Sequence, residues 1–144
     1  MRLLFALLFV VTLAQATTPY LLTKIPSVYP LVEIYSKHVP KKYIEIIKKE
    51  IIKATDELHI KNDSFSERPL TIFITDLSVD DKKAVKVALL MGEEVKRLDD
   101  GEIVFALTYF NVDIIEVDDE DFDILESVDF LLEQFKDQYI EDNE

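Results

Sequence analysis

Glycine is almost absent from this chain, and that scarcity most constrains how it can fold. Only Gly92 and Gly101 occur among 144 residues. Tight hairpin turns between strands usually need glycine, because their central residues adopt a positive φ. We therefore predict a mostly α protein, a small helical bundle of three to five helices, which leaves room for short strands near residues 70–75 and 112–117. An α+β arrangement is the alternative.

Two segments have the apolar spacing of amphipathic helices. Residues 40–58 start at Pro40, which suits the first turn of a helix. Their apolar residues recur at steps of three and four: Ile44, Ile47, Ile51, Ala54 and Leu58. Residues 119–140 follow the same rule with Phe122, Leu125, Val128, Leu132, Phe135 and Tyr139. Each segment predicts a helix with one buried side.

Residues 78–98 predict a third and more apolar helix. Ser78 is an N-cap candidate, and Asp80 and Asp81 lie in the first turn. The apolar residues at helical spacing are Val85, Ala88, Met91, Val95 and Leu98. Three more widen this face beyond half the circumference: Val87, Leu89 and Leu90. Such a helix must be covered on two sides, so we expect it in the centre of a bundle or beside a cavity.

Residues 70–75 and 102–117 are ambiguous between helix and strand. The first segment (LTIFIT) is rich in β-branched and aromatic residues, which favours a strand, but a buried helical lead-in has the same composition. Residues 102–109 are equally ambiguous, and residues 112–117 favour a strand.

The N-terminus is typical of a secretory signal peptide. Arg2 precedes an apolar run at residues 3–13, and Ala14-Gln15-Ala16 supplies a cleavage pattern. The run is shorter than the roughly 20 residues that span a bilayer, so we expect no membrane span. Residues 1–16 are the predicted signal peptide of a secreted, extracellular protein. We expect an extended Pro-containing lead-in at 17–39 with a helical turn near 31–36, a single helical domain at 40–140 and a frayed acidic tail at 141–144.

Charge is distributed unevenly along the chain. Residues 17–98 hold 14 Lys and Arg against 12 Asp and Glu, whereas residues 99–144 hold one base, Lys136, against 17 acids. Phosphate backbones and anionic membrane surfaces are repelled by such a half, which excludes nucleic acid as a partner. A basic protein partner remains compatible with this charge.

Residue types that carry catalysis are scarce. The chain has no cysteine, and its histidines, His38 and His59, have no zinc-site spacing. No nucleophile elbow or phosphate loop occurs, so we predict a protein that is not an enzyme and has no cofactor. Asp119, Asp121 and Asp123 match the start of a calcium loop, but the required glycine and final glutamate are missing, so no metal site is expected. Asn62 begins a sequon and is a candidate glycosylation site.

Three short motifs resemble the nematode fatty-acid- and retinol-binding proteins. They are Ile25-Pro26-Ser27-Val28-Tyr29 followed by Val39-Pro40, then Leu77-Ser78-Val79-Asp80-Asp81-Lys82, and Phe105-Ala106-Leu107. The resemblance implies a secreted all-α fold with an internal apolar cavity for fatty acids and retinol. It implies no catalytic residues, because that family is not enzymatic.

These observations favour a secreted binding protein for small hydrophobic ligands, held in an apolar cavity between helices. The predicted cavity residues are Ile47, Ile51, Val85, Leu89, Leu90, Phe105, Leu132 and Phe135. Lys86 is the predicted partner of a ligand carboxylate. The same apolar residues equally suit a packed core. The alternative function is a secreted acidic protein that docks a basic protein partner through its C-terminal half.

Overall fold

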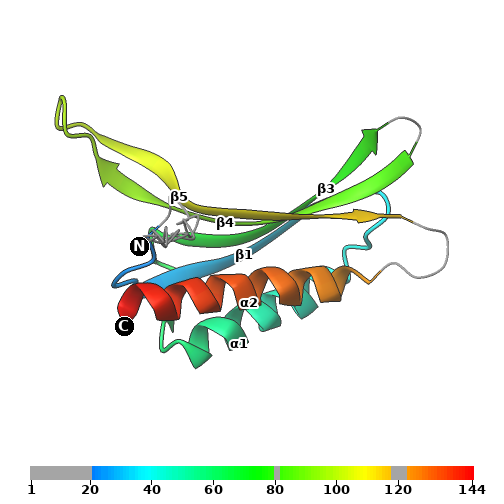
Figure 1. Cartoon of the computed structure of the whole chain (residues 1–144), viewed down its shortest axis with the longest axis horizontal. Helices are drawn as coiled ribbons and strands as arrows, with labels where there is room; N and C mark the ends of the chain where they lie inside the picture. The colour runs from blue at the N-terminus through cyan, green and yellow to red at the C-terminus, as the bar shows by residue number, and fades with distance from the viewer. Residues whose placement is uncertain (1–20, 80–81, 118–122) are drawn as a thin grey trace, which may run out of the picture.

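The computed structural model is an α/β protein with a five-stranded mixed sheet and two helices (Figure 1). It describes residues 21–79, 82–117 and 123–144, so the predicted signal peptide lies outside the described residues. The elements in chain order are β1 (Ser27–Tyr35), α1 (Tyr43–Glu57), β2 (Lys61–Asn62), β3 (Pro69–Val79), β4 (Lys82–Lys96), β5 (Ile103–Glu116) and α2 (Ile124–Asn143).

The prediction of a mostly α bundle of three to five helices, and with it the all-α fold implied by the family resemblance, is wrong. The predicted third helix at 78–98 is the end of β3 followed by β4. β4 lies between β3 and β5 and buries residues on both faces of the sheet. A strand buried on both faces is a nearly continuous apolar run, and its periodicity does not distinguish it from a buried helix.

The expectation that scarce glycine disfavours hairpins is wrong at the β4–β5 hairpin, where one glycine is sufficient. Gly101 has a φ of 73° and its N–H donates to the carbonyl oxygen of Arg97. Aspartate side chains satisfy the other turn groups, since Oδ1 of Asp99 accepts from the N–H of Asp100, and Oδ1 of Asp100 accepts from the N–H of Glu102. Asx contacts of this kind replace the glycines that a turn would otherwise need.

The strand order is β2-β1-β3-β4-β5. β1 and β3 are parallel and are connected through α1, whereas β3, β4 and β5 form an antiparallel meander. The expected helical turn near 31–36 is wrong, because this segment lies in β1. Pro30 is tolerated there because β2 pairs only with Ser27 and Val28, so Pro30 has no partner strand on that side.

Both predicted amphipathic helices exist. α1 lies within the predicted 40–58 and buries Ile47, Ile51 and Ala54. α2 begins at Ile124, and its cap Asp123 accepts hydrogen bonds from the N–H groups of Leu125 and Glu126. Residues 119–122 of that prediction lie outside the described residues. α2 continues to Asn143, where Asp142 and Asn143 hydrogen-bond to the backbone of Leu22.

The core lies between one face of the sheet and the two helices (Figure 1). α1 packs near β1, and α2 packs on β4 and β5. Tyr109 of β5 and Phe135 of α2 make an edge-to-face contact with ring centroids 5.2 Å apart. Within the described ranges, no helix is long and apolar enough to cross a membrane.

Candidate functional site

Strand alternation divides the side chains of the sheet into two sets. Ile72, Ile74, Val87 and Leu89 face the helices and are fully buried. Their neighbours in each strand point to the opposite side, which no described helix or strand covers (Figure 1). We call this side the open face. Its large apolar residues are Tyr29, Leu31, Tyr35, Phe73, Leu77, Leu90, Ile103, Phe105, Leu107, Phe110, Val112 and Ile114.

The open face exposes an unusually large apolar surface. Seven of its residues are between 36% and 67% exposed: Tyr35, Ile103, Phe105, Leu107, Phe110, Val112 and Ile114. Side chains of about 150–250 Å² each, exposed by roughly half, present on the order of 700 Å² in total. The largest apolar patch on a typical monomer is about 300–600 Å² and is often functional. The open face is therefore a candidate binding surface.

The usual alternation of polar and apolar residues is reversed in the middle of β5. Phe110, Val112 and Ile114 lie on the open face, whereas Asn111 and Asp113 lie on the side of the helices. A sheet with one wet face normally places its polar residues outward. Here Oδ2 of Asp113 instead accepts a hydrogen bond of 2.7 Å from the Ser127 hydroxyl of α2. The reversal leaves Phe110, Val112 and Ile114 partly exposed on the open face.

A β-bulge decides which residues of the β4–β5 hairpin join the open face. Met91 pairs with Tyr109, but Gly92 pairs with Leu107, so Thr108 is the extra residue. Without this shift, Thr108 and Ala106 would lie on the open face. With it, the open face gains Leu107, Phe105 and Ile103. The bulge therefore extends the apolar surface to the end of the hairpin.

The open face is concave, because both ends of the sheet bend away from the helices (Figure 1). Small residues of β4, Ala84, Ala88 and Gly92, lie in its middle strand between larger neighbours. The Phe105 ring rests on Gly92, since a Cβ built there would lie 2.3 Å from Cζ of Phe105. Gly92 is thus required for the close approach of this ring.

Charges on the open face are balanced, although the chain carries a formal charge of −13. The bases are Lys82, Lys86 and Lys96, and the acids are Glu33, Glu94 and Glu116. Lys82 and Glu116 form an ion pair of 3.3 Å. Lys86 is half-buried and makes no ion pair with another described residue; its cross-strand neighbours are Thr75 and Ile114. Among the described residues, the Thr75 hydroxyl is buried without a hydrogen-bond partner.

The predicted site residues fall on both faces of the sheet rather than in one cavity. Six of them are core residues between the sheet and the helices: Ile47, Ile51, Val85, Leu89, Leu132 and Phe135. The other three, Lys86, Leu90 and Phe105, lie together on the open face. The sequence prediction missed Leu107, Phe110, Val112 and Ile114 there. The signal for Phe110, Val112 and Ile114 was the period-two spacing of residues 110–114.

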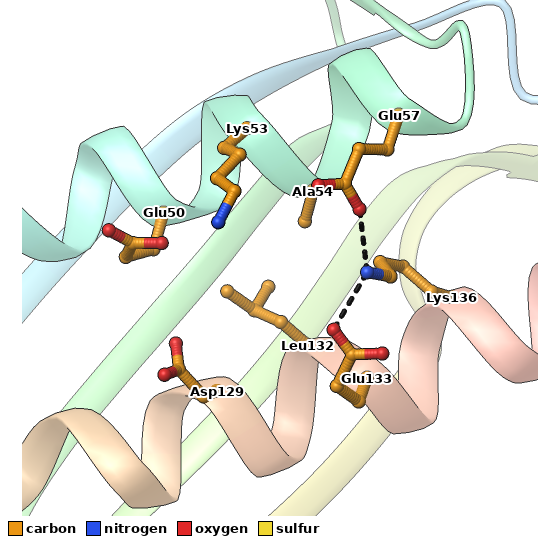
Figure 2. Close-up of a pocket in the computed structure, with 8 residues that line it drawn as sticks. All are labelled: Glu50, Lys53, Ala54, Glu57, Asp129, Leu132, Glu133 and Lys136. Atoms are coloured by element: carbon orange, nitrogen blue, oxygen red, sulfur yellow. Dashed lines mark hydrogen bonds and ion pairs between the residues drawn. The ribbon is translucent and has the colours of Figure 1, made fainter.

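The groove between the helices is polar and does not match the predicted apolar cavity. It has a volume of about 320 Å³. Figure 2 shows its lining of Glu50, Lys53, Ala54, Glu57, Asp129, Leu132, Glu133 and Lys136. Nζ of Lys136 lies 2.7 Å from Glu133 and 2.6 Å from Glu57, which joins α2 to α1. Hydrogen bonds to Glu133 and Glu57 raise the pKa of Lys136 to about 12, and the bond from Lys136 lowers the pKa of Glu57.

The described residues contain no group of three or more His, Cys, Asp or Glu side chains placed to hold a metal. The predicted glycosylation site, Asn62, lies in β2. Its Nδ2 donates to Oδ1 of Asp56 over 2.8 Å, and its Oδ1 accepts from the Thr55 hydroxyl over 2.9 Å. Glycosylation at Asn62 stays a prediction.

The acids of the C-terminal half lie away from the open face where the structure describes them on α2. Its exposed acidic residues are Glu126, Asp129, Glu133, Asp137 and Glu141. The predicted calcium-loop run, apart from Asp123, lies outside the described residues. The chain matches no protein-family model, no curated protein and no solved structure.

Proposed function

We propose that this protein is a non-enzymatic, secreted binding protein for small hydrophobic ligands such as fatty acids, and that the ligand lies on the open face. The reversed alternation in β5 carries the proposal. It places Phe110, Val112 and Ile114 toward solvent while Asn111 and Asp113 take the sheltered side. Exposed apolar side chains cost free energy unless a ligand removes them from water, at about 25 cal/mol per Å² buried.

A carboxylate-bearing ligand suits the charges of this face. Lys86 lies among Thr75, Ala88 and Ile114 with its ammonium group free of ion pairs to other described residues. A fatty-acid carboxylate near Lys86 would gain a charge-assisted hydrogen bond. The acyl chain would then extend along β4 and β5 toward Leu107 and Phe105. Each methylene removed from water contributes about 0.8 kcal/mol.

The test is titration of the purified protein with an environment-sensitive fluorescent fatty acid, followed by displacement with oleate. The double variant Leu107→Asn/Ile114→Asn should raise the Kd about 30-fold, since it removes roughly 2 kcal/mol of apolar contact. Phe65→Asn is the matched control, because Phe65 is 91% exposed and lies outside the open face. A signal that does not saturate, or an equal Kd for the double variant, would overturn the proposal.

The acidic outer surface of α2 supports a second proposal, docking of a basic protein partner. The five exposed acids of α2 are accompanied by a single base, Lys136, which is already paired with Glu57 and Glu133. Binding of this kind should weaken strongly at about 0.5 M salt, because exposed charges are screened. Binding to the open face should persist at that salt concentration. Retention of a basic partner at high salt would contradict the second proposal.

A further inference from the structure

We propose that two copies of this chain associate through their open faces, so that the hydrophobic ligand is held between two sheets. The inference rests on the proposed function for the ligand, but the association itself is argued from area, charge and the state of the sheet edge.

The exposed apolar area of the open face is large enough for a dimer interface. A stable protein–protein interface buries about 800 Å² on each partner. The seven exposed apolar residues of the open face present on the order of 700 Å², and half-buried neighbours such as Phe73 and Leu90 add to this. The open face therefore has the size of one half of a standard interface.

The balanced charges of the open face allow two copies to approach each other there. Two chains of formal charge −13 repel each other unless the contacting surfaces are neutral. The open face meets this condition with three bases and three acids. Each end of the face also carries both signs, with Glu94 and Lys96 at one end and Lys82 and Glu116 at the other. When one copy is turned end for end, the acid at each end can therefore meet a base of the other copy.

The edge strand β5 is partly blocked against pairing with another strand. β5 ends the sheet, and a free edge is the usual alternative route to association. In β5, however, the N–H of Val112 donates to Oδ1 of Asn111 over 2.9 Å, and the N–H of Ile114 donates to Oδ1 of Asp113 over 3.0 Å. These two donors are not available to a pairing strand. The face is therefore favoured over the β5 edge.

Sedimentation equilibrium of the purified protein, with its N-terminal residue established by mass spectrometry, tests the inference. Across roughly 1 to 100 µM, without ligand and with oleate, we expect the mass to rise to twice that of one chain. Leu107→Asp/Ile114→Asp should keep the single-chain mass, because four buried charges would face each other in the dimer. Phe65→Asp should still double.

A second measurement does not depend on those charges. The chain has no cysteine, so Val112→Cys introduces a unique thiol in the middle of the open face. Its alkylation rate should fall at least 10-fold as the protein concentration rises through the association range. The rate for Phe65→Cys should stay constant.

A single-chain mass at every concentration would overturn the dimer and leave fatty-acid binding by one chain in place. A dimer that persists in Leu107→Asp/Ile114→Asp, or a Val112→Cys rate that is independent of concentration, would place the interface elsewhere and also overturn it. The third outcome is a dimer that passes both tests but from which oleate does not displace the fluorescent fatty acid. This result would support the association and remove the proposed function.

Discussion

The two faces of the sheet are built from alternate residues of the same strands but have opposite surroundings. On the covered side, Ile72 and Leu89 have no exposed surface, whereas Leu107 and Ile114 on the open side are 55% and 58% exposed. Both sets are apolar, so composition does not distinguish them. This chain has more apolar surface than its two helices can cover. The surplus is gathered on one side, where it is available for binding.

Substitutions of phenylalanine should destabilise the protein more on the covered face of the sheet than on the open face. Phe135→Ala removes a fully buried ring that contacts Tyr109 and should lower the free energy of unfolding by about 3–5 kcal/mol. Phe110→Ala on the open face should cost less, about 2 kcal/mol, because Phe110 is 38% exposed and only the rest of its side chain is buried. Urea denaturation of dilute protein measures both. Equal losses would show that the open face is covered in the folded chain.

A smaller effect tests the reversed alternation of β5. Ser127→Ala removes the hydroxyl that donates to Asp113 and should lower the free energy of unfolding by about 1–3 kcal/mol, since the Asp113 carboxylate loses a sheltered donor. Ser78→Ala, at an exposed position of β3, is the control and should have no effect. If the two variants unfold at the same urea concentration, the hydrogen bond between Ser127 and Asp113 does not help to fix which face of β5 points toward the helices.

Leu107→Asn should change the free energy of unfolding by no more than about 0.5 kcal/mol, as is usual for exposed positions. Thermal denaturation at a concentration too low for association measures this change. The same substitution is expected to weaken ligand binding, so stability and binding should separate on the open face. A loss of stability as large as that of Phe135→Ala would mean that Leu107 belongs to the core.

The smallest effect concerns the ion pairs that join the two helices. The pKa of Glu57 is lowered from 4.5, chiefly by its hydrogen bond with Lys136, so its contribution is present above pH 4.5 and is lost as the pH falls. The pKa of Lys136 is raised from 10.5 to about 12, so its contribution is present below pH 10.5 and is lost as the pH rises through about 12. Between about pH 6 and about pH 3, the Tm of Lys136→Gln should fall slightly less than that of the unchanged chain. An identical fall would show that these exposed pairs do not couple the helices.

Local patterns were sufficient where an element is buried on one side only. The spacing of Ile44, Ile47, Ile51 and Ala54 predicts α1, which the structure confirms. The same reasoning was wrong for β4, because this strand carries apolar residues on both faces of the sheet and so lacks the period-two alternation of a strand. Residues 102–109 are ambiguous between helix and strand for the related reason that short apolar runs suit both, and the structure places residues 103–109 in β5.

The candidate site was only partly predictable. Lys86, Leu90 and Phe105 were chosen for a cavity between helices, and the structure brings them together on the open face instead. Leu107 could not be assigned to that face from its spacing, because the bulge at Met91 and Gly92 shifts the register by one residue. A shift of one residue moves each following side chain of a strand to the other face.

By itself, the sequence determined the two amphipathic helices and the surplus of apolar residues, because helical spacing and composition depend only on neighbours along the chain. The tertiary structure alone decided that residues 82–96 form a strand, and which apolar residues are covered. Strand pairing joins residues far apart in the chain, and its energy depends on partners that no local pattern specifies. The open face is a result of that pairing.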